Sequence, residues 1–136
     1  MNTFHLRVYK ANGTFVEGEA ELVVVTTVDG QYGVMAGHEN LVVSVEPGIM
    51  KYRMAGGEDK IAAISSGMMR VENNDVLVLV ETAEHPEEID AVRAKEDEAE
   101  AKEAMLQKKS EQEYLMVETM LRRAITRIRV KNKDIK

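Results

Sequence analysis

The chain has no cysteine among its 136 residues. That absence excludes a disulfide framework, a thiolate nucleophile and a thiolate metal site. The chain also lacks any run near the ~18 consecutive apolar residues that a membrane-spanning helix requires. Its first residues, Met1–His5, do not show the charged-then-apolar order of a signal peptide. We therefore expect a soluble protein that reaches a membrane, if at all, through a partner.

Glycine and proline are absent from the stretch after Pro86, which is rich in Ala, Glu, Lys and Arg. Before Pro86 the chain has short β-branched segments separated by glycine-centred turns. This change predicts a sheet domain over residues 1–85 and a helical arm over residues 86–136, an α+β fold.

The net charge of −6 is unevenly spread along the chain. Residues 87–113 hold 10 acids and 5 bases, whereas residues 114–136 hold 2 acids and 7 bases. The acidic balance argues against nucleic-acid binding. We expect the basic end either to fold back on the acidic helix before it or to reach an acidic partner.

Seven segments before Pro86 have the alternating or continuous apolar pattern of short strands. They are Phe4–Tyr9, Leu22–Val25, Leu41–Val45, Ile49–Tyr52, Ile61–Ile64, Met68–Val71 and Val76–Val80. Eight or so strands at this spacing are typical of an antiparallel β-sandwich or flattened barrel.

Little in residues 1–85 resembles a catalytic site. His38 lies in a glycine-framed loop, and no acid stands at metal-ligand spacing from it, so a solvated or locally hydrogen-bonded histidine is expected. Asp29 and Glu39 are discounted as an acid–base pair because acids in turns mostly serve the turn. No nucleophile, base and oxyanion donor can be grouped. We therefore expect neither catalysis nor a metal site.

Two helices are predicted in the arm. Pro86 fits the first position of a helix that runs to about Lys109. Its apolar stripe would be thin: Ile89, Val92, Ala99 and Leu106.

Ser110–Glu113 has the form of a capping box, which marks the start of the second helix. The amphipathic stripe of that helix would be Tyr114, Val117, Leu121, Ala124 and Ile128. A short link between the helices favours an antiparallel hairpin. Exposed charge pairs contribute only ~0–1 kcal/mol each, so such a hairpin can open.

Several motifs of the chain, taken together in their order and spacing, resemble those of the epsilon subunit of the bacterial F-type ATP synthase. The strongest is Ile89–Ala94, which reads I-D-A-V-R-A and resembles the family's I/L-D-x-x-R-A signature. The weaker pieces are Val16–Glu19, Asp29–Val34, Gly37–His38, Pro47–Ile49, Ser66–Met68, Val76–Val78 and Thr82–Glu84. Together they cover nearly the whole chain.

The resemblance implies a non-catalytic central-stalk subunit of a proton-translocating ATP synthase, peripheral at the cytoplasmic face of the bacterial cell membrane. The sandwich would bind the gamma subunit and sit on the c-subunit ring. The ring-side residues would be Gln31, Tyr32 and His38. The extended arm would inhibit ATP hydrolysis by meeting the catalytic beta subunits through Arg122, Arg123, Arg127 and Arg129.

The resemblance also implies no required cofactor and a regulatory ATP that stabilises the folded arm. The implied ATP residues are Glu84, Ile89, Asp90, Arg93, Ala94, Arg123 and Arg127. Apart from the family, a closed hairpin would bring the three arginines together, and guanidinium groups match phosphate geometry. No glycine-rich phosphate loop is present, which favours a sensor over a hydrolytic site. The other interpretation stays open: Asp90 and Arg93 as a surface ion pair, with the arginines solvated.

The chain departs from the family in two places. Residues 36–41 read A-G-H-E-N-L, where the family commonly reads P-G-H-A-P-L. Glu100 follows Arg93 by seven residues on the same predicted helix face, and its charge would repel ATP. We expect ATP binding to be weak.

Two other functions fit the pattern without the family. One is a stand-alone ATP-sensing protein, which ATP titration would reveal. The other is an adapter whose helical arm holds clients, for which many partners in pull-downs would be diagnostic.

Overall fold

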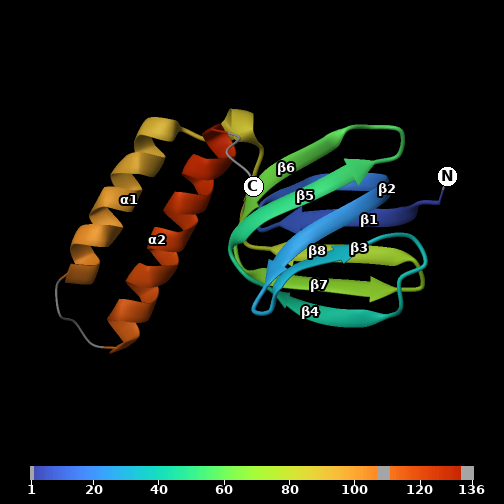
Figure 1. The fold of residues 1–136 in the computed structure, drawn as a ribbon, viewed down its shortest axis with the longest axis horizontal. Coiled ribbons are helices and arrows are strands. Elements are labelled where there is room, and N and C mark those ends of the chain that lie inside the picture. The colour runs from blue at the N-terminus through green and yellow to red at the C-terminus, as the bar shows by residue number, and fades with distance from the viewer. Residues whose placement is uncertain (1, 107–110, 133–136) are drawn as a thin grey trace. The chain divides into compact units, whose positions relative to one another are not determined.

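The computed structural model describes residues 2–106 and 111–132, and the side chains of Leu106 and residues 111–114 lie outside that description. It divides the chain into two compact units, Met1–Ala83 and Glu84–Lys136. Strands make up the first unit, and helices make up most of the second (Figure 1).

The described residues form nine strands that belong to one sheet. They are β1 (Phe4–Lys10), β2 (Gly13–Thr27), β3 (Gly30–Val34), β4 (Leu41–Val45), β5 (Gly48–Met54), β6 (Asp59–Ile64), β7 (Gly67–Glu72), β8 (Asp75–Val80) and β9 (Ala83–Glu84). The order across the sheet is β4-β7-β8-β1-β2-β5-β6-β9, with β3 paired to β2.

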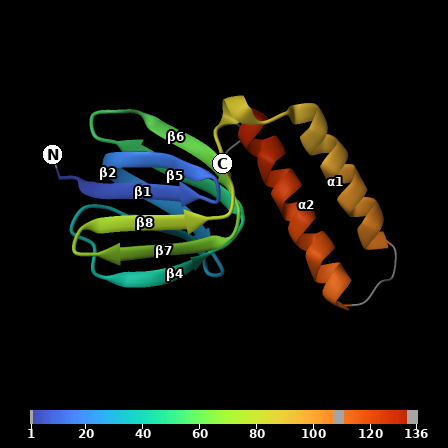
Figure 2. The same cartoon turned by 180° about the vertical axis from the view of Figure 1, so that it is seen from behind.

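The long strand β2 passes from one layer of the sheet to the other. Its first half pairs with β1, and its second half pairs with β3 and β5. The register shifts between Ala20 and Leu22, and Gly18 has a φ of +151°, where a side chain would be strained. Irregularities of this kind bend a strand. Figure 2 shows β1, β8, β7 and β4 together in one layer.

The core lies between the two layers. Its largest fully buried side chains include Tyr52, Phe4, Leu6, Met50 and Met69. Alternation along β1 sends Phe4, Leu6 and Val8 inward, as the period-two pattern predicts. The predicted β-sandwich is confirmed. The pair β1 with β8 is parallel rather than antiparallel. No hairpin joins these two strands, so the local sequence does not set their relative direction.

Each of the seven predicted strands lies within an observed strand. The pattern missed β3, whose Gln31, Tyr32 and Gly33 do not read as apolar but pair with the end of β2. It also missed β9, and it did not predict that the first half of β2 is a strand. Pairing with a neighbour, which sequence periodicity does not report, makes these segments strands.

The arm contains a short 3₁₀ helix, η1 (Pro86–Glu88), followed by α1 (Ala91–Leu106) and α2 (Glu111–Asn132). The predicted continuous helix from Pro86 is wrong. The chain leaves η1 through Ile89 in an extended conformation, with φ −85° and ψ 125°, before α1 begins. The predicted end near Lys109 and the capping box at Ser110 lie outside the described residues.

The two helices run antiparallel side by side, in agreement with the predicted hairpin (Figures 1 and 2). The predicted stripe of α1 is partly wrong: Val92 is 68% exposed and Ala99 is exposed, whereas Ala94 and Ala101 are buried. Small side chains let helix axes approach closely, so the alanines fix the packed face. On α2 Ala124 is buried as expected, and buried Val130 was not predicted.

Candidate functional site

Asp90 caps the start of α1. Its side-chain Oδ1 accepts a hydrogen bond from the backbone N–H of Arg93 at 3.1 Å, and its carbonyl accepts one from Ala94 at 2.9 Å. An N-cap carboxylate satisfies a backbone donor that would otherwise lack a partner and complements the helix dipole. The aspartate of the I-D-A-V-R-A motif therefore acts on the backbone of Arg93. The described contacts contain no ion pair between the two side chains.

Arg127 of α2 joins three segments of the arm. Its Nε lies 2.8 Å from Glu84 Oε1, and its Nη2 donates to Glu84 Oε2 at 3.2 Å. Its Nη1 donates to Asp97 Oδ2 of α1 at 3.5 Å. The Arg127 side chain is only 16% exposed. Within the second unit, one guanidinium thus links Glu84, α1 and α2.

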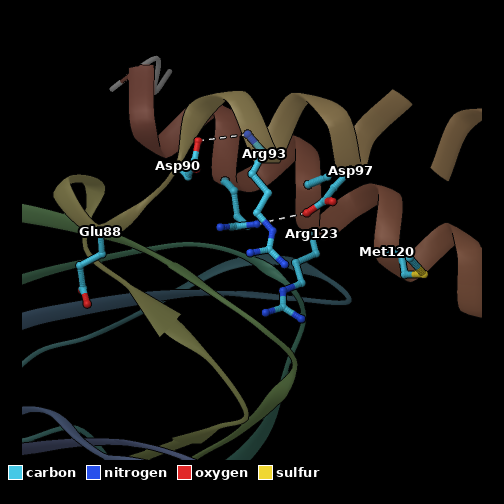
Figure 3. A pocket seen from close by; sticks show the side chains of 8 residues that line it. Glu88, Asp90, Arg93, Asp97, Met120 and Arg123 are labelled. Carbon is cyan, nitrogen blue, oxygen red and sulfur yellow. Dashed lines mark hydrogen bonds and ion pairs between the residues drawn. The ribbon is translucent and has the colours of Figure 1, made fainter. Parts of the chain in front are cut away.

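A pocket of about 510 Å³ opens between α1 and α2 beside this arginine (Figure 3). Its volume lies in the usual range for small-molecule sites. The lining residues are Glu88, Asp90, Arg93, Asp97, Met120, Arg123, Ala124 and Arg127. Three acids and three arginines give the lining a formal net charge of zero.

The three arginines differ in their surroundings. Arg93 and Arg123 are exposed, and Figure 3 shows both side chains turned into the pocket. Within the part of the chain that the structure describes, neither lies within ion-pair distance of a carboxylate. The Arg127 guanidinium, in contrast, contacts Glu84 through Nε and Nη2 and Asp97 through Nη1. Arg93 and Arg123 are therefore the two cations best placed to receive an anionic ligand.

Four of the seven residues predicted for ATP line the pocket: Asp90, Arg93, Arg123 and Arg127. Glu84 instead contacts Arg127. Ile89 and Ala94 are buried and do not line the pocket.

The sequence patterns did not single out Glu88, Asp97, Met120 or Ala124 as pocket residues. A signal was present, since Asp97 follows Arg93 by one helical turn. On α2, residues 120, 123, 124 and 127 share one side at steps of three and four. Glu100, expected to repel a phosphate, does not line the pocket; Asp97 is the α1 carboxylate that does.

Two family models together cover nearly the whole chain. Residues 3–86 match the beta-sandwich domain of the ATP synthase delta/epsilon chain. Residues 87–132 match the long alpha-helix domain of the same chain.

The chain belongs to the ATP synthase delta/epsilon chain family.

Curated bacterial relatives agree with this membership and with the resemblance seen in the motifs. The ATP synthase epsilon chain of Caldanaerobacter subterraneus subsp. tengcongensis is 39% identical over 96% of this chain and 95% of its own length. The epsilon chain of Syntrophomonas wolfei is 35% identical over 98% of both chains. That of Ruminococcus albus is 38% identical over 98% of this chain and 99% of its own.

Chains in two solved ATP synthase structures share the fold. A chain in the Euglena gracilis mitochondrial ATP synthase, solved as OSCP, F1 and c-ring, matches with a TM-score of 0.78 and 25% identity, over 90% of this chain and 77% of that chain. A chain in the central stalk and c-ring of the Tetrahymena thermophila mitochondrial enzyme matches with a TM-score of 0.66 and 11% identity, over 97% and 96%. The second match supports the fold alone.

Side-chain hydrogen bonds hold the loop at residues 36–41, where the family commonly reads P-G-H-A-P-L. His38 Nε2 lies 3.0 Å from the Tyr32 hydroxyl, and its Nδ1 lies 2.7 Å from the Glu39 carbonyl. Asn40, which replaces a family proline, accepts a hydrogen bond from the Asn73 N–H at 2.9 Å. His38 is therefore locally hydrogen-bonded, as the simpler interpretation predicted.

The other predicted interface residues lie on the surface of their own units. Gln31 is exposed on β3, and Arg122 and Arg129 are exposed on α2. Among residues 2–106 and 111–132 no helix has the length and apolar content needed to cross a membrane. In the same ranges no three His, Asp or Glu side chains gather as metal ligands would.

Replacing Asp90 tests its role as a cap. Asp90→Ala should destabilise the arm by about 1 kcal/mol and speed amide exchange in the first turn of α1 roughly fivefold. Asp90→Asn should change exchange little, because asparagine also caps helices. Native-state amide exchange measures both variants. Equal acceleration in the two would show that the charge, and not the cap, stabilises the turn.

Proposed function

We propose that the protein is a non-catalytic subunit of the central stalk of an F-type ATP synthase, with an arm that inhibits ATP hydrolysis. The observation that carries this proposal is the match of both units, in order, to the two domains of the delta/epsilon chain. A chain of the same fold is found in the central stalk and c-ring of the Tetrahymena thermophila enzyme. By analogy, the sheet unit binds the gamma subunit and the c-ring, and Gln31, Tyr32 and His38 face the ring.

The arm has the surface of a segment that meets partners. Leu115, Met116 and Met120 are at least half exposed on α2, and Arg122, Arg123 and Arg129 are exposed on the same helix. Flexible methionines beside arginines suit an adaptable protein–protein contact. In this proposal the opened arm lies along the gamma subunit, and the arginines meet acidic loops of the beta subunits. The protein is held at the cytoplasmic face of the bacterial membrane by these partners.

A regulatory ATP site between α1 and α2 is the finer part of the proposal. The supporting observation is the pocket with Arg93 and Arg123 turned into it (Figure 3). Phosphate oxygens match guanidinium donors, and a pocket of about 510 Å³ has room for a nucleotide. Bound ATP would join α1 to α2 and favour the closed arm. The same pocket would also suit a stand-alone ATP sensor, which membership of the family makes the second choice.

Removing the arm tests inhibition. Deleting residues 87–136 leaves β9 and the sheet unit's buried cluster intact. The truncated chain should still join the assembled ATP synthase but raise its ATP hydrolysis about fivefold, the low end of typical coupling between sites. Hydrolysis rates of the enzyme assembled with the full and truncated chains give the comparison. Unchanged hydrolysis at full occupancy would remove the inhibitory role.

Replacing Arg123 tests the ATP site. Arg123→Ala should weaken ATP binding roughly tenfold or more, since a hydrogen bond to a charged group contributes about 1.5–3 kcal/mol. Arg129→Ala is the matched control, because Arg129 is exposed on the same helix but does not line the pocket. Calorimetry with millimolar ATP, with and without Mg²⁺, measures both. Equal weakening would mean that α2 attracts ATP only through its overall charge.

A further inference from the structure

The two carboxylates on Arg127 hold it in different ways. Glu84 Oε2 accepts a hydrogen bond from Nη2 at 3.2 Å, and Glu84 Oε1 lies 2.8 Å from Nε without a hydrogen bond to it. Glu84 does not line the pocket. Asp97 takes Nη1 alone, at 3.5 Å, with a side chain that is 43% exposed. Coulomb attraction grows as two charges approach, so a contact of 2.8 Å is stronger than a single contact of 3.5 Å. Asp97 is therefore the weaker partner and the one on the pocket side.

Asp97 occupies the part of Arg127 that a ligand in the pocket would reach. Both Asp97 and Arg127 line the pocket, and Figure 3 shows the Asp97 carboxylate turned toward its interior. A phosphate oxygen approaching Nη1 of Arg127 must displace this carboxylate or lie beside it. Either event costs free energy, through a lost ion pair or through repulsion between like charges.

We propose that Asp97 is an intramolecular anion that occupies the phosphate-binding edge of Arg127 and thereby sets how weakly the pocket binds nucleotide. The proposal rests on the ATP site proposed above and adds a determinant of its affinity. Arg93 and Arg123 receive the first phosphate contacts, and Arg127 joins them only when Asp97 moves away. The Asp97–Arg127 pair also joins α1 to α2 without any ligand.

The residue that limits affinity is therefore Asp97 rather than Glu100. Glu100 lies one turn further along α1 and does not line the pocket. Asp97 lies within an ion-pair distance of the arginine that a phosphate would use. Coulomb energy falls with distance and is screened in water, so the nearer, pocket-facing charge has the larger effect.

Calorimetry of the full chain with ATP, with and without Mg²⁺, tests the proposal. Asp97→Asn keeps the shape of the side chain and removes its charge, and should tighten ATP binding about three- to tenfold. Glu96→Gln is the matched control: it makes the same charge change at the neighbouring residue, which is exposed and does not line the pocket. The control should bind ATP as the wild type does. Asp97→Ala, which favours helix, is a second variant should the amide disturb α1.

The outcomes separate this inference from the ATP site itself. Tighter binding by both Asp97 variants and unchanged binding by Glu96→Gln supports it, including the case in which only the Asp97 variants bind measurably. Equal or weaker binding by the Asp97 variants, with clear binding by the wild type, overturns the role of Asp97 and leaves the ATP site standing. Equal tightening by Glu96→Gln reduces the effect to net charge and also overturns it. No heat from any variant at millimolar ATP removes the ATP site and this inference together.

Discussion

The guanidinium of Arg127 is the contact that joins the three segments of the described arm. It joins Glu84, at the start of the second unit, to Asp97 of α1, while its own backbone belongs to α2. Without it, the carboxylates of Glu84 and Asp97 would lose the cation that they share. Ion pairs at partly exposed positions contribute only about 0.2–1 kcal/mol each to the free energy of folding. The contacts of Arg127 therefore fix the geometry of the arm but stabilise it only modestly.

The two units differ in what holds them. The sheet unit buries Phe4, Tyr52, Met50 and Met69 in one cluster, and large buried side chains contribute roughly 1.5–3 kcal/mol each. The facing sides of α1 and α2 bury mostly alanines, Ala94, Ala101 and Ala124, which remove far less apolar surface from water. Local stability follows buried apolar contact, so the arm is the part expected to open first. In the proposed function, that difference lets the arm open while the sheet unit stays folded.

Sequence patterns predicted the sheet unit well because period-two alternation reports burial directly. Phe4, Leu6 and Val8 point inward as the pattern indicates. The patterns did worse where pairing decides the structure, as in β3 and in the parallel partnership of β1 with β8. These depend on neighbours distant in sequence, which local periodicity does not encode.

The arm shows the same limit. Pro86 and two glutamates suit the start of a helix, and a short 3₁₀ helix does form there. The α-helix begins only at Ala91, after the Asp90 cap, and Val92 lies on its exposed side rather than on the predicted packed face. Convergence of the arginines was predictable from a closed hairpin. The contacts of Arg127 with Glu84 and Asp97 were not, because they require the rotation of α1 about its axis to be known to within a residue.

The most direct test is the distance between spin labels at Val92 and Ile125, exposed positions on α1 and α2, measured by pulsed electron paramagnetic resonance in the full chain. Arg127→Gln removes the charge that joins the segments, and Arg129→Gln removes an equal charge elsewhere on α2. If Arg127 holds the hairpin closed, the wild type and Arg129→Gln give one narrow distance, and Arg127→Gln gives a broader and longer distribution. An equally narrow, unshifted distance in Arg127→Gln would contradict the account.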